Sequence, residues 1–98
     1  MKDAIETARE ELLPLLESLG SLARDEGETD QVAFFAFVAA GVERAREADD
    51  LAEPFMELST AAFRGFAYSA PVSFLLDQAL LVAQTLSHTL SATGGDPN

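Results

Sequence analysis

The chain has 98 residues, with 17 Asp and Glu against 6 Lys and Arg, and it contains no cysteine. The lack of cysteine excludes disulfides, thiolate metal sites and thiol catalysis. The net charge of −11, with the basic residues spread singly, argues against binding to nucleic acids or anionic membranes, because both attract proteins through Lys and Arg.

The length and the composition indicate one cytoplasmic domain. We expect a single helical domain at residues 1–93 and a disordered tail at 94–98, which begins with two glycines. Residues 1–3 lead into an acidic amphipathic segment and not into a signal peptide. The 66–90 stretch has the length of a membrane span, but polar residues interrupt it, so we expect no membrane helix and take the cytoplasm as the location.

The first helix is expected from Asp3 to Arg24, where apolar residues recur at alternating spacings of three and four. Pro14 lies inside this pattern. A proline inside a helix removes one backbone hydrogen bond and clashes with the carbonyl four residues earlier, at a cost of about 3 kcal/mol. Since the pattern keeps its phase across Pro14, we expect a first helix that is kinked or broken there, and no loop.

The pattern of apolar residues predicts three more helices. The second is expected at about 30–48, after an acidic turn, and the third begins near Pro54 and runs to about Tyr68. The fourth is expected at 71–92, after a turn that contains Ser69 as a cap. Four helices joined by short connections favour antiparallel neighbours, so we predict an all-α, antiparallel four-helix bundle, with an orthogonal helical array as the alternative.

The fourth predicted helix has two apolar faces. Its main stripe suits the bundle core, but a second row lies almost opposite, again with spacings of four and three. We call this second set the 74–88 row: Phe74, Gln78, Leu81, Thr85 and His88. Uncharged polar groups between large apolar residues are typical of a helix–helix interface, whereas a solvated face carries Lys and Glu. The row is expected to pack against a second copy of the chain, another helical protein, or the first helix of the same bundle.

The phenylalanines suggest an alternative function. Six of the seven lie on the second and third predicted helices. If the small alanines beside them leave a gap, an apolar ligand could bind there; if the rings interdigitate, they form an ordinary core. The candidate ligand-binding residues are Phe34, Phe37, Phe55, Phe63 and Phe66.

The residues that could carry chemistry do not form a motif. His88 is the sole histidine, and neither a Ser-His-Asp arrangement nor the Glu-x-x-His pairs of a di-metal bundle accompany it. There is no glycine-rich phosphate loop. We therefore expect no catalytic residues, metal or cofactor, and no enzyme. The expected function is a helical protein–protein interaction or assembly module, homodimeric, with a carrier of a small apolar ligand as the alternative.

Overall fold

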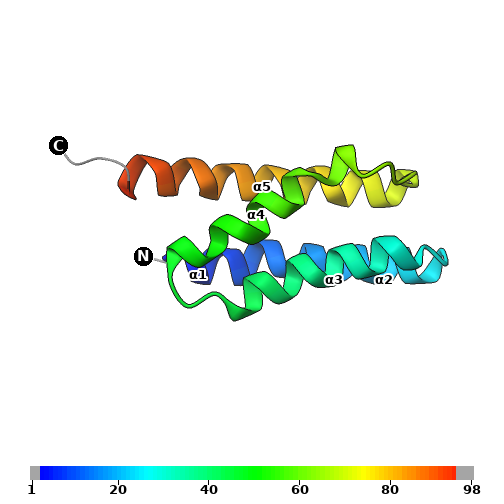
Figure 1. The fold of residues 1–98 in the computed structure, drawn as a ribbon, viewed down its shortest axis with the longest axis horizontal. Helices are drawn as coiled ribbons and strands as arrows, with labels where there is room; N and C mark the ends of the chain where they lie inside the picture. Colours follow the sequence, from blue (N-terminus) through cyan, green and yellow to red (C-terminus); the bar gives the residue numbers. More distant parts are fainter. Residues whose placement is uncertain (1–2, 95–98) are drawn as a thin grey trace.

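The computed structural model describes residues 3–94 of the chain and the side chains of residues 3–89. This part is an all-α, antiparallel four-helix bundle, as predicted, in which consecutive helices run in opposite directions (Figure 1). The first helix comprises α1 (Ala4–Thr7), the π-helical turn η1 (Ala8–Leu12) and α2 (Leu13–Asp25), and α3 (Thr29–Arg44) is the second. The third comprises the 3-10 turn η2 (Ala48–Leu51), α4 (Ala52–Ser59) and the 3-10 turn η3 (Ala61–Phe63), and α5 (Ala70–Gly94) is the fourth.

The first helix is continuous but irregular before Pro14. It begins at a capping box, in which Asp3 accepts from the Glu6 N–H at 2.8 Å and Glu6 accepts from the Asp3 N–H at 3.2 Å. In η1 the Leu13 N–H donates to the Ala8 carbonyl, five residues back, so the helix widens by one residue. The predicted interruption at Pro14 is therefore confirmed, in the form of a π-helical turn that accommodates the proline without ending the helix.

The third helix is shorter than predicted. It ends at η3 instead of Tyr68, because Gly65 adopts a φ of +78°, a left-handed conformation that ends a helix. Residues 64–69 then form an irregular connection to α5, which we call the strap. The strap is held by tertiary contacts: the Tyr68 hydroxyl donates to the Ala61 carbonyl at 2.8 Å, and the Phe66 ring packs on Phe34 with 5.9 Å between centroids.

The helices pack in a closed order around one core. α2 packs against α3 and α5, and α4 packs against α3 and α5 (Figure 1). Gly41 lets α4 approach α3 closely, since a Cβ at this position would lie 3.0 Å from the Pro54 Cβ. Each of the four helices contributes buried apolar residues, which include Ala8, Leu12, Leu16, Leu19, Phe35, Val38, Val42, Leu51, Leu58, Val72, Ala79 and Ala83.

The ends of the second and fourth helices differ slightly from the prediction. α3 ends at Arg44, four residues early, because Ala45 is extended. α5 begins at Ala70, and the Ser69 hydroxyl accepts from the Val72 N–H at 3.4 Å. Gly94 belongs to α5, and the rest of the predicted tail, 95–98, lies outside the described residues. Within 3–94, no helix is both long enough and apolar enough to cross a membrane.

Candidate interaction surface

The 74–88 row lies on the outer surface of the bundle. Phe74 is 65% exposed and Leu81 is 63% exposed, and the three polar members of the row are also exposed. The alternative in which this row packs on the first helix of the same chain is therefore wrong. The buried stripe of α5 is the other set of residues that the sequence suggested: Val72, Leu76, Ala79, Ala83 and Leu86.

Helical geometry explains why the row points outward. Successive residues of an α-helix are about 100° apart, which places Leu81 about half a turn from the buried stripe. The flanks of α5 are occupied by partly buried residues. Leu75 lies beside Pro14 and Leu22 of the first helix, and Leu80 also packs against the core. The 74–88 row is thus the side of α5 that is farthest from the other helices.

The outer face of α5 carries little charge. Between residues 65 and 95, Asp77 is the only Asp, Glu, Lys or Arg of the sequence. By contrast, the exposed surface of the first helix includes Glu10, Glu11 and Glu17. In a chain of net charge −11, the outer face of α5 is therefore a strip with a single carboxylate on an acidic molecule.

Two more large apolar side chains lie exposed on the neighbouring helix. Met56 of α4 is 67% exposed and Phe63 of η3 is 87% exposed. Pro54 contacts α3, and Met56, two residues later, points about 200° away from Pro54 around α4 and therefore away from α3. The sequence pattern did not single out Met56, and it placed Phe63 in the interior, on a third helix expected to extend to Tyr68. The Arg64-Gly65 pair directly after Phe63 was the available signal for an earlier end.

The five phenylalanines of the alternative ligand site do not share one interior. Phe34 and Phe55 are buried and Phe66 is partly buried, but Phe37 and Phe63 are exposed, so the expected interior position is wrong for these two. Phe34, Phe37 and Phe66 border an open hollow between α3, α4 and the strap. Arg64 occupies part of that region. Its guanidinium lies 4.5 Å from the Phe34 ring centroid and forms a 2.7 Å ion pair with Glu57.

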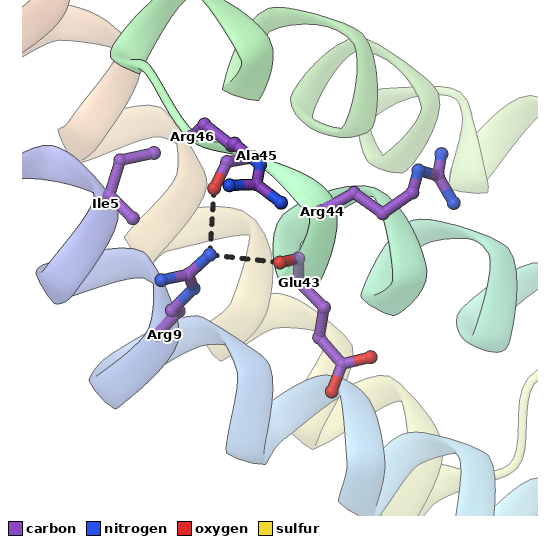
Figure 2. Close-up of a pocket in the computed structure, with 6 residues that line it drawn as sticks. All are labelled: Ile5, Arg9, Glu43, Arg44, Ala45 and Arg46. Atoms are coloured by element: carbon purple, nitrogen blue, oxygen red, sulfur yellow. Dashed lines mark hydrogen bonds between the residues drawn. The ribbon is translucent and has the colours of Figure 1, made fainter.

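A second hollow lies where the first helix meets the end of α3. Arg9 dominates it, and its Nη2 donates to the carbonyls of Glu43 at 2.9 Å and Ala45 at 2.8 Å (Figure 2). These carbonyls are at the C-terminal end of α3, where intrahelical donors run out. Arg44 also borders the hollow, but its guanidinium points away from Arg9 (Figure 2). Arg9 therefore caps the end of α3, and Arg44 does not join it there (Figure 2).

The fold shifts the pKa values of Asp50 and Tyr68. Asp50 Oδ2 accepts from the backbone N–H groups of Arg46 at 3.0 Å and Glu47 at 3.1 Å, and these bonds hold the pKa of its carboxyl below the ordinary 3.8. Burial raises the pKa of the Tyr68 phenol above the ordinary 10.0, with the Arg64 guanidinium acting in the opposite direction. Both side chains hold irregular segments of the chain, and neither lies on the outer face of α5.

Within the described residues, no cluster of chemical groups is as strong a candidate for a functional site as the outer face of α5. Among residues 3–89, no three His, Asp or Glu side chains come together in a way that could hold a metal ion. Over the same range, the His88 side chain is exposed and makes no hydrogen bond or ion pair with another described residue. No protein-family model, curated protein or solved structure matches the chain.

Proposed function

We propose that the protein is a non-enzymatic assembly module of the cytoplasm that forms homodimers through the 74–88 row of α5. The observation that carries this proposal is the exposure of Phe74 and Leu81 on a face almost free of charge. An exposed apolar helix face, bordered by groups that can hydrogen-bond, is typical of a surface that is covered in the functional state.

Charge makes the outer face of α5 the surface through which two copies associate most easily. Two molecules of net charge −11 repel each other, so they associate most easily through the surface with the fewest carboxylates. The outer face of α5 fits this requirement. A basic partner protein, by contrast, would gain most from the acidic surfaces of the first helix and its following turn, not from α5.

The polar residues of the row also suit a self-association surface. Gln78, Thr85 and His88 are uncharged donors and acceptors, and they can exchange hydrogen bonds with the same residue types of a second copy. Burying them costs little free energy when each finds a partner, whereas an unpaired buried polar group costs about 1–3 kcal/mol. The row therefore combines apolar area with polar groups that a second copy can satisfy.

Light scattering of the purified chain over a range of protein and salt concentrations tests the proposal. We expect the mass to rise from 10.5 kDa toward twice that value with concentration. Added salt should promote dimerisation, because it screens the repulsion between acidic molecules over about 10 Å at 0.1 M. A monomer at every concentration up to about 1 mM, where binding is worth only about 4 kcal/mol, would reject the homodimer.

Binding of a small apolar ligand is the alternative function. It is less well supported, since Phe37 and Phe63 are exposed and the hollow beside Phe34 is open. Native mass spectrometry of the same sample separates the two functions. A retained apolar molecule on a monomer supports the carrier, whereas a ligand-free dimer supports the assembly module.

A further inference from the structure

The outer face of α5 is built from pairs of residues that are seven positions apart. Phe74, Leu81 and His88 form the middle line of the face. On the two sides of this line lie the pair Asp77 and Gln84 and the pair Gln78 and Thr85. All seven side chains are exposed, so the whole set is available to a partner.

Helical geometry fixes where these residues lie relative to Leu81. At about 100° and 1.5 Å per residue, Phe74 and His88 lie about 10 Å before and after Leu81 and within about 20° of its direction. Asp77 and Gln84 share one flank, about 40–60° from the middle line, and one lies before and the other after Leu81. The other flank holds Gln78 and Thr85 in the same manner.

This arrangement has a consequence for two copies related by a two-fold axis. Suppose that the axis passes beside Leu81 and is perpendicular to α5. A residue that precedes Leu81 by a given distance then faces a residue of the second copy that follows Leu81 by the same distance. Both residues lie on the same flank of their helices. Each member of a heptad pair then meets the other member. Leu81 meets Leu81 of the second copy, as an isologous interface requires.

We propose that the two α5 helices of the dimer pack antiparallel, with the two-fold axis beside Leu81. This inference rests on the proposed function and specifies its geometry. Phe74 contacts His88 of the second copy, Asp77 receives the side-chain N–H of Gln84 of the second copy, and Gln78 faces Thr85 of the second copy. The axis lies one residue from the middle of α5, so the two helices overlap along nearly their whole length.

Electrostatics favours this direction over a parallel pair. In a parallel dimer the two His88 side chains face each other, and the two Asp77 carboxylates lie at the same height on adjacent helices. The antiparallel pair separates the Asp77 side chains along the helix axis by about 12 Å, since eight residues at 1.5 Å lie between their facing positions. It also places the positive N-terminal end of one α5 beside the negative C-terminal end of the other.

Met56 is an exposed apolar side chain on the helix beside α5. It lies on α4, which packs against α5. A specific interface buries roughly 1,000 Å² or more, so an exposed apolar side chain of α4 would add to the area that the α5 pair covers. In the antiparallel arrangement the α4 helices of both copies lie on the same side of the α5 pair.

Cysteine cross-linking tests the direction directly, because the natural chain contains no cysteine. Phe74→Cys and His88→Cys are prepared singly, one of them with a mass tag, and are oxidised alone and as a mixture. A disulfide requires Cα atoms within about 7 Å, whereas residue 74 of one copy lies about 21 Å along the axis from residue 74 of an antiparallel partner. We expect a tagged–untagged cross-link in the mixture and little cross-linking of either variant alone.

Two further variants complete the test. Leu81→Cys should cross-link with itself, and Ser18→Cys, exposed on α2, gives the background level. Strong cross-linking of Phe74→Cys alone and of His88→Cys alone would show a parallel pair and overturn the antiparallel arrangement, with the dimer intact. A dimer by light scattering in which none of the three α5 variants exceeds the Ser18→Cys background would overturn both the arrangement and the use of the row. A monomer by light scattering would overturn the homodimer itself.

Discussion

Replacing Leu81 by aspartate should dissociate the dimer without unfolding the chain. Leu81 is 63% exposed in the protomer, so about two thirds of its surface is available for burial by a partner. Full burial of a leucine is worth about 1.5–3 kcal/mol, which gives about 1–2 kcal/mol per copy and about 2–4 kcal/mol for the dimer. The Kd should therefore rise roughly 30- to 1,000-fold, and the two new carboxylates near the axis will raise it further.

The effect of Leu81→Asp on folding should be small. A substitution on an exposed helix surface changes the free energy of unfolding by about 0.5 kcal/mol, and aspartate has a helix propensity up to about 0.7 kcal/mol worse than the best residues. Circular dichroism should therefore show the same helix content. The melting temperature must be compared at a low protein concentration where both chains are monomeric, because dimerisation itself stabilises the folded state.

Sedimentation equilibrium measures the Kd, and Phe37→Asp is the matched control. Phe37 is 52% exposed on α3, away from α5, so the same charge placed there should leave dimerisation close to that of the natural chain. The reasoning is refuted if Leu81→Asp unfolds at unchanged association state, or if it dimerises as tightly as the Phe37→Asp control.

Three other predictions concern the stability of the protomer. Gly65→Ala should lower the free energy of unfolding by about 1–2 kcal/mol in urea denaturation, since φ is +78° there, whereas Gly20→Ala, inside α2 with open space around it, should raise it by up to about 1 kcal/mol. Arg9→Met should lower it by about 1–2 kcal/mol, because two carbonyls at the end of α3 lose a charged donor. The pKa of Asp50 is lowered, so its contribution to the free energy of unfolding is present above pH 3.8 and is lost as the pH falls through the lowered pKa. The melting temperature of Asp50→Asn should therefore be below that of the natural chain at pH 6, and the difference should shrink toward pH 3.

The helices themselves could be predicted from the sequence because they depend on local pattern. The spacing of the leucines around Pro14 predicted a helix that continues past the proline, and the helix does continue, with one extra residue in the π-helical turn. The end of the third helix could not be predicted in the same way. Residues 64–69 are held by Phe34 and Gln31 of α3, which are distant in the sequence, and by the Ala61 carbonyl just before the strap.

Gln31 shows how much of this strap depends on tertiary structure. Its side chain is buried, its Nε2 donates to the Ala67 carbonyl at 3.3 Å, and its Oε1 is buried among the described residues with no hydrogen-bond partner. Nothing in the sequence marks this glutamine, because its role depends on a carbonyl 36 residues away.

The 74–88 row could be located in the sequence, but its environment could not. A face with two large apolar residues and few charges can either pack in the core of the same chain or contact a partner protein. Which of the two occurs depends on whether another helix of the chain lies opposite the main stripe of α5. The structure places the first helix beside Leu75 and α4 on the other flank, which leaves no helix of the same chain to cover Leu81. Because Leu81 is exposed, the residue pairs that flank the middle line of the face can be interpreted as contacts with a partner. Asp77 is the one carboxylate of this face, and an antiparallel second copy can satisfy it through Gln84. The low charge of the face is the condition under which two acidic molecules can associate there.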